Sequence, residues 1–153
     1  MKKILLLSAM SLLFLSVSAQ MSQFVDLGLP SGTLWKSTNE PGFYTYDEAL
    51  KSFGKFLPTK AQFDELKECC EWIWEGRGFK VVGPNGDFIF LPAAGGRNFD
   101  GNVDGVGSGG GYWSSTPNGA DNAWYLFFHH GELDTSHDNR CYGLSVRIVL
   151  CCL

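Results

Sequence analysis

Positive charge is scarce in this sequence, in which 12 lysine and arginine residues stand against 16 aspartate and glutamate residues, for a net charge of −4 at pH 7. Binding to DNA or RNA through phosphates needs a basic patch, so this balance argues against a nucleic-acid partner. Hydrophobic residues make up 44% and aromatic residues 14% of the 153 residues. That content is enough to build a core, so we expect a folded chain.

The sequence signatures of common enzyme sites are also missing. The glycine-rich run 107–111 is not followed by Lys-Ser or Lys-Thr, so it is not a phosphate-binding P-loop. Ser114 and Ser115 lack the G-x-S-x-G frame of a hydrolase nucleophile. We therefore predict no catalytic residue and expect that the protein is not an enzyme.

Cysteine is present in an odd number, which excludes complete pairing within one chain. The residues are Cys69, Cys70, Cys141, Cys151 and Cys152. Adjacent cysteines rarely bridge to each other because the geometry is strained, and no C-x2-C spacing of a zinc site occurs. The pairing stays open, and we expect Cys69 or Cys70 to be a small core residue on a helix.

Two patterns suggest a metal ion. Residues 100–105 fit the first half of an EF-hand loop, D-x-N-x-D-G, but the twelfth position, which should be glutamate, is Gly111. We therefore predict a polar surface loop and no cofactor, while a calcium site of another kind stays open. His129 and His130 are consecutive on an expected strand, so they should point to opposite faces, and no metal site is predicted there.

The N-terminus has the three parts of a secretory signal peptide in order. Lys2 and Lys3 are followed by an apolar segment over 4–17 and by the small-residue pattern Val17-Ser18-Ala19. We predict a signal peptide over 1–19 and a single domain over 20–153, with no transmembrane segment in the mature chain. The protein is expected to be exported to the periplasm, the cell surface or the medium.

The pattern of turns and apolar residues predicts an α+β fold. Thr45 with Glu48 and Thr59 with Gln62 are capping-box patterns, and each predicts the start of a helix. The late strands have no helix between them, which disfavours a parallel sheet. Strands are expected over 24–29, 33–36, 79–82, 88–91, 112–115, 122–129 and 143–150, with a glycine-rich loop over 94–111.

An ordered set of short motifs resembles the Fibrobacter succinogenes major paralogous domain family of exported Bacteroidetes proteins. The first is the run from Val25 to Trp35, Val-Asp-Leu-Gly-Leu-Pro-Ser-Gly-Thr-Leu-Trp. The later ones are Leu57-Pro58-Thr59, Glu65-Leu66, Val82 to Gly86, Ile89 to Gly95, Tyr112-Trp113-Ser114-Ser115 and Ser145-Val146-Arg147. The resemblance covers nearly the whole mature chain, although the segment between Trp35 and Leu57 is short and Ile148 stands where many members have proline.

The resemblance implies a C-type-lectin-like fold with two early helices and short antiparallel strands joined by long loops. That fold is related to the formylglycine-generating enzyme and to the variable proteins of diversity-generating retroelements. The family has no general catalytic activity. The resemblance leaves two other functions open. One is a structural domain of the cell envelope, and the other is a cysteine-dependent enzyme with Cys141 as the candidate catalytic residue.

The C-terminal third resembles a retroelement variable region, in which asparagine codons are randomised in their first two letters. Lysine, glutamate, glutamine, methionine and tryptophan cannot arise in that way. None of these five types occurs in the run 134–144, whereas Glu132 would have to be a fixed position. The resemblance therefore implies a binding surface that varies between copies.

The residue pattern of the segment 122–129 agrees with a binding surface. Trp124, Leu126 and Phe128 should face inward, which leaves the side chains between them on the opposite face. Beside the polar loop that follows, that face is typical of a ligand-binding surface, although Tyr125 and Phe127 could also pack under a neighbouring loop. The predicted ligand, a protein or a glycan, would contact Tyr125, Phe127, His129, His130, Asp134, Thr135, Ser136, His137, Asp138, Asn139, Arg140 and Tyr142.

Overall fold

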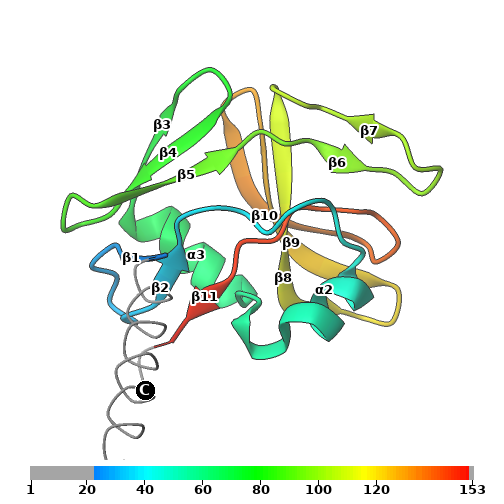
Figure 1. Cartoon of the computed structure of the whole chain (residues 1–153), viewed down its shortest axis with the longest axis horizontal. Coiled ribbons are helices and arrows are strands. Elements are labelled where there is room, and N and C mark those ends of the chain that lie inside the picture. Colours follow the sequence, from blue (N-terminus) through cyan, green and yellow to red (C-terminus); the bar gives the residue numbers. More distant parts are fainter. Residues whose placement is uncertain (1–22, 152–153) are drawn as a thin grey trace, which may run out of the picture.

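The computed structural model describes residues 23–151, so the predicted signal peptide and Cys152 lie outside the described residues. Two short α-helices and several small antiparallel sheets make up this part of the chain, which confirms the α+β prediction (Figure 1). Within it, no helix is long and apolar enough to cross a membrane.

Helix α2, Tyr46–Phe53, begins with the predicted capping box. The Thr45 hydroxyl accepts a hydrogen bond from the Glu48 backbone N–H at 3.3 Å, and the Glu48 carboxylate accepts one from the Thr45 N–H at 2.8 Å. Two backbone donors that the first helical turn leaves unpaired are satisfied in this way. A short 3-10 turn, η1 at Gly54–Phe56, follows directly.

Helix α3, Lys60–Cys69, begins in the same way. The Thr59 hydroxyl accepts from the Gln62 backbone N–H at 3.2 Å, and the Gln62 side-chain oxygen accepts from the Thr59 N–H at 2.8 Å. Phe63 and Leu66 form its fully buried face. Both helix starts were therefore predictable, because a capping box involves only four consecutive residues.

The strands form four small sheets with antiparallel neighbours. The first sheet has the order β1-β2-β11, with β1 at Phe24–Asp26, β2 at Leu34–Lys36 and β11 at Val149–Leu150. The second is β3-β4-β5, at Glu71–Trp74, Gly78–Val82 and Phe88–Pro92. The third is the hairpin of β6, Gly96–Arg97, with β7, Val103–Asp104. The fourth is β10-β9-β8, with β8 at Gly109–Asn118, β9 at Asn122–His129 and β10 at Glu132–Asn139.

The predicted hairpin between 79 and 91 is confirmed by β4 and β5, but it gains a third strand, β3, which is not predicted from the sequence. Trp72 and Trp74 of β3 pack edge-on against Phe79, with ring centroids 5.5 and 5.1 Å apart. The two tryptophans are partly buried and pack against the core cluster that contains Phe79.

The largest difference from the sequence prediction is that 132–139 form strand β10 where a loop is predicted. His130 and Gly131 have φ values of 47° and 92°, which makes a two-residue turn of the kind that favours hairpins. The turn pairs Glu132 with His129, and the ladder then continues to Asn139 opposite Asn122. Polar residues are tolerated here because β10 is an edge strand.

The predicted last strand over 143–150 is shorter in the structure, where β11 alone pairs with β2. Residues 143–145 instead make single bridges to three different segments, at Arg97, Tyr44 and Tyr112. An extended segment that changes partner at each residue cannot form a continuous ladder. The expected strand is therefore extended chain over most of its length.

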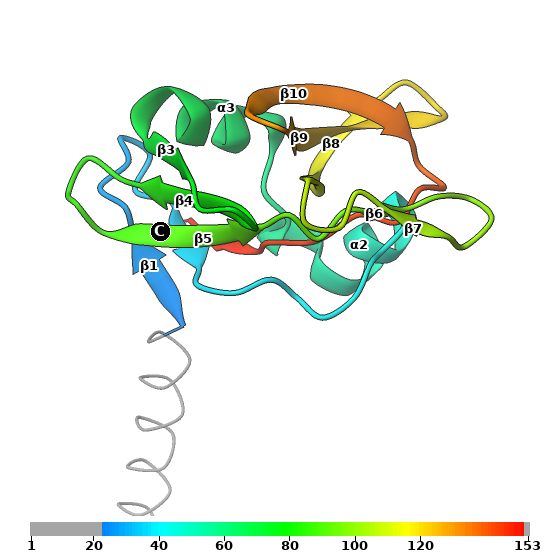
Figure 2. The same cartoon turned by 90° about the horizontal axis from the view of Figure 1, so that it is seen from above.

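The two helices cover opposite faces of the β8–β9–β10 sheet. One face joins the core cluster that includes α3, through Leu126, Phe128, Phe63 and Leu66. The other face joins the cluster that includes α2, through Trp113, Ala123, Tyr46 and Ala49. Figure 2 shows α3 beside β9 and β10, with the β6–β7 hairpin at the far end of the molecule from the β3–β4–β5 sheet. The α2-side face is left partly open beside this hairpin.

Candidate functional site

A pocket of about 240 Å³ lies on the α2-side face of the β8–β9–β10 sheet. Its walls are β9, the β6–β7 hairpin and the segment 138–144, and its floor is the start of β8. Small-molecule sites usually measure roughly 300–1,000 Å³. The pocket is therefore sized for one part of a ligand, such as one side chain or one sugar ring.

Glycines keep the floor of the pocket open. Gly109 lies opposite His129 and Gly111 opposite Phe127 in the β8–β9 pairing. A methyl group added to Gly111 would come within 2.9 Å of the Leu144 side chain. Glycine in a strand often marks such a close approach, and here it leaves the ring of Phe127 accessible from the pocket.

Aromatic side chains form one wall. Tyr125 and Phe127 are half-buried neighbours on one face of β9, with ring centroids 6.1 Å apart, and Tyr142 lies across the pocket. Burial and the nearby Asp138 carboxylate raise the pKa of Tyr125. The hydroxyl is therefore neutral at physiological pH, and it shares a hydrogen bond with the Ser136 side chain.

Charged groups line the rest of the pocket. Asp104 and Asp138 lie on opposite walls, and neither forms an ion pair with another described residue. The guanidinium of Arg97 lies 4.0 Å from the carboxylate of Glu48 on α2, which partly neutralises it. The Asp104 and Asp138 carboxylates are therefore less neutralised by nearby opposite charges than the Arg97 guanidinium.

The pocket brings together five of the twelve residues named from the sequence. These are Tyr125, Phe127, His129, Asp138 and Tyr142. The register places Asp134 and Ser136 on the same face, opposite Phe127 and Tyr125. Since β10 is a strand, its alternate residues point the other way, and the predicted surface is divided between two faces.

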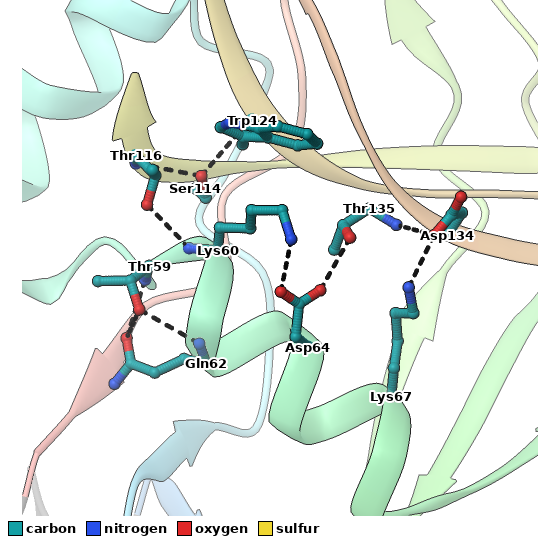
Figure 3. A network of polar contacts seen from close by, with 10 residues as sticks. All are labelled: Thr59, Lys60, Gln62, Asp64, Lys67, Ser114, Thr116, Trp124, Asp134 and Thr135. Carbon is teal, nitrogen blue, oxygen red and sulfur yellow. Dashed lines mark hydrogen bonds and ion pairs between the residues drawn. The ribbon is translucent and has the colours of Figure 1, made fainter. Parts of the chain in front are cut away.

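The opposite face of β10 is tied to α3 (Figure 3). The Thr135 hydroxyl donates to the Asp64 carboxylate at 2.8 Å, and Asp64 also accepts from Lys60 at 2.6 Å. Burial raises the pKa of Asp64, but the hydrogen bonds from Lys60 and Thr135 outweigh it and hold this pKa below its usual value. At the strand edge, Lys67 pairs with Asp134 at 2.8 Å. These contacts attach β10 to α3.

The remaining predicted residues have local structural contacts. The ring of His137 lies edge-on to Trp124, with centroids 5.3 Å apart, on the α3 side. The Asn139 side-chain oxygen accepts from the backbone N–H of Cys141 at 3.0 Å. Arg140 donates to the carbonyl oxygens of Asn122 and Gly119.

The expectation that His129 and His130 point to opposite faces is wrong. Their rings lie edge-on with centroids 4.2 Å apart. The reason is the positive φ of His130, which takes this residue out of the strand and into the turn. Among residues 23–151, however, no group of three or more His, Cys, Asp or Glu side chains is placed to hold a metal ion.

The described cysteines are free thiols and lie away from the pocket lining. Cys69 and Cys70 are partly buried at the end of α3 and pack against the core, and burial raises the pKa of Cys70 to about 11. Cys141 and Cys151 are exposed. Because its pKa is raised, the Cys70 thiol is a poor nucleophile. Cys141 is not among the residues that line the pocket.

The wall formed by the β6–β7 hairpin is not predicted from the sequence. Arg97, Asn98 and Asp104 belong to it and lie in the segment predicted only as a glycine-rich loop. The half EF-hand motif lies in this hairpin, and one Asp100 oxygen accepts hydrogen bonds from both the backbone and the side chain of Asn102. The high glycine content of 94–111 was the sequence signal that could have indicated this wall, since glycine permits close packing of backbones.

Comparison with family models, with curated proteins and with solved structures gives no match for this chain. The resemblance to the major paralogous domain family therefore stays a prediction, and the site is interpreted from its own geometry.

Proposed function

We propose that this protein is an exported, non-enzymatic ligand-binding domain with a C-type-lectin-like fold, and that its pocket takes part of a protein or a glycan. The observation that carries the proposal is the pocket itself. The aromatic face of β9 meets Asp138 and Tyr142 there, over a floor of glycines. Aromatic contact area together with adaptable short polar groups is typical of binding surfaces.

Replacing Phe127 with alanine tests this function. The protein would be used to select binders from a displayed random-peptide library and from a glycan array, and Kd would be measured for each selected binder. We expect Phe127→Ala to weaken binding at least about tenfold, because aromatic residues in pockets dominate binding energies. The matched control is His137→Ala, since His137 is exposed on the other face of the sheet.

The control should change Kd by no more than about twofold, as expected for a residue outside the contact. Circular dichroism would show that both variants stay folded. Binders that tolerate Phe127→Ala as well as they tolerate His137→Ala would contradict the proposal.

If the protein is also a retroelement variable protein, its gene should lie near a second, similar copy of the codons for residues 112–149. We expect the two copies to differ at adenines, and the differences to fall at pocket residues such as Tyr125, Phe127, Asp138 and Tyr142. The codon of Thr135 should be the same in both copies, because the Thr135 hydroxyl donates a hydrogen bond to Asp64. Sequencing the surrounding DNA tests this, and differences spread equally over both faces of β10 would argue against diversification for binding.

A further inference from the structure

The β6–β7 hairpin exposes apolar side chains to an unusual degree. Phe99, in its turn, is 77% exposed, Val103 in β7 is 44% exposed, and Val106 just after β7 is 68% exposed. The other large hydrophobic side chains exposed in the described chain, Phe56, Ile73 and Phe88, lie on other elements. Clustered exposed apolar groups are typical of contact sites rather than of ordinary surface.

The turn that carries Phe99 is held by its own hydrogen bonds. The Asn98 backbone N–H donates to the Asn102 carbonyl at 2.9 Å, and the Asn102 N–H donates back to the Asn98 side chain at 2.9 Å. The Asn98 amide also donates to the Asp104 carboxylate at 3.3 Å. An exposed side chain on a fixed turn loses little conformational freedom when it binds, which favours its use in recognition.

The β6–β7 hairpin carries these side chains and also forms one wall of the pocket. Asn98 and Gly105 line the pocket and directly precede Phe99 and Val106, whereas Val103 and Asp104 are consecutive in β7 and point to opposite faces. A ligand that entered the pocket and extended over the hairpin would therefore reach Phe99 and Val106. A single sugar ring fills the pocket alone, whereas a protein surface has the area and the apolar groups to cover both.

The charges of the pocket indicate which group enters it. Asp104 and Asp138 line the pocket without an ion pair among the described residues, whereas Arg97 in the same lining lies 4.0 Å from the Glu48 carboxylate. The aromatic side chains of Tyr125, Phe127 and Tyr142 line the pocket as well. Carboxylates and aromatic faces both attract cations. The net charge of −4 adds to this attraction.

We infer that the ligand is a protein that places a lysine or arginine side chain in the pocket and an apolar patch over Phe99 and Val106. The inference rests on the proposed binding function of the pocket and names its ligand class. A bilayer is the less favoured occupant, because the negative surface of anionic lipids would be repelled by Asp100 and Asp104 within the same hairpin.

The test selects binders with the folded protein in three parallel arms: displayed random peptides, a glycan array, and vesicles with an anionic lipid. We expect peptides in which lysine or arginine stands beside aliphatic or aromatic residues. The double variant Phe99→Ser with Val106→Ser, and separately Asp138→Asn, should each weaken these peptides at least about tenfold. Phe88→Ser is the matched control, because Phe88 is 52% exposed on the β3–β4–β5 sheet, and it should leave Kd unchanged.

The outcomes separate this inference from the proposed function. Glycans, or peptides without a basic residue, that need Phe127 but not Phe99 would overturn the inference and leave the binding function standing. Vesicle binding that is lost with Phe99→Ser and Val106→Ser would also overturn it, in favour of a membrane contact. If no arm yields a binder that depends on Phe127, both proposals fail.

Discussion

Replacing Arg147 with methionine should lower the free energy of unfolding of this protein more than any other substitution proposed for it. The side chain is fully buried and donates to the carbonyl oxygens of Lys36, Ser37 and Phe90 and to the side-chain oxygen of Asn39, at 2.6 to 3.0 Å. Methionine would leave these partly buried acceptors without their donor, at roughly 1–3 kcal/mol each. We expect a loss of at least about 4 kcal/mol in the free energy of unfolding, against a usual total of about 5–15 kcal/mol.

Urea unfolding followed by tryptophan fluorescence would measure this loss. The matched control is Arg140→Met, because Arg140 also donates to two backbone carbonyls but is only partly buried. Water can replace its hydrogen bonds, so we expect a loss of about 1 kcal/mol. Equal losses for the two variants would show that the buried network around Arg147 does not hold the fold together.

Burial lowers the pKa of Arg147 to about 10, so the group is still charged at neutral pH. Its partners are dipoles from two separate parts of the chain: residues 36–39, at the end of β2 and just after it, and the strand β5. Asn39 in turn donates to the hydroxyl of Tyr112, whose own O–H donates to the Pro92 carbonyl. This network explains in physical terms why arginine stands in the Ser145-Val146-Arg147 motif.

Replacing Gly95 with alanine should have the second largest effect, on stability and on binding together. Gly95 has a φ of +74°, and an added methyl group would overlap the carbonyl oxygen of Asp104 in β7. The left-handed backbone costs about 1–2 kcal/mol for a residue with a side chain, and the overlap adds roughly 1–3 kcal/mol. Since β7 must move to relieve it, the wall of the pocket moves too.

Gly105→Ala is the matched control, because Gly105 has nearly the same φ, +76°, and lines the same pocket. A methyl group there would meet its nearest atom, the Cα of Gly95, at an ordinary 3.7 Å. We expect only the backbone cost of about 1–2 kcal/mol from this variant. Urea unfolding and the Kd of a selected peptide would be measured for both, and a Gly95→Ala protein no weaker than Gly105→Ala would contradict this account.

The two expectations concern different parts of the proposed binding domain. Arg147 holds together the core on which β8 and β9 rest, whereas Gly95 sets how closely the β6–β7 hairpin approaches the sheet. The first variant should weaken binding only as far as it lowers the folded fraction. The second should weaken binding by more than its loss of stability explains, because the pocket wall itself is displaced.

The local parts of the fold were predictable from the sequence. The two capping boxes, the β4–β5 hairpin and the inward direction of Leu126 and Phe128 on β9 all agree with the structure. Each depends on residues within a few positions of one another, through a hydrogen bond to the next turn or through the alternation of a strand. The α+β class follows from the same local signals.

Tertiary structure alone decided the candidate site. β10 exists because a two-residue turn returns a polar segment to β9, and its pleat separates Thr135 and His137 from the pocket residue Asp138. The second wall comes from a hairpin about 30 residues earlier in the chain, and the buried charge of Arg147 is satisfied by groups more than 50 residues away. Such contacts are set by how whole elements pack, and no short sequence pattern carries that information.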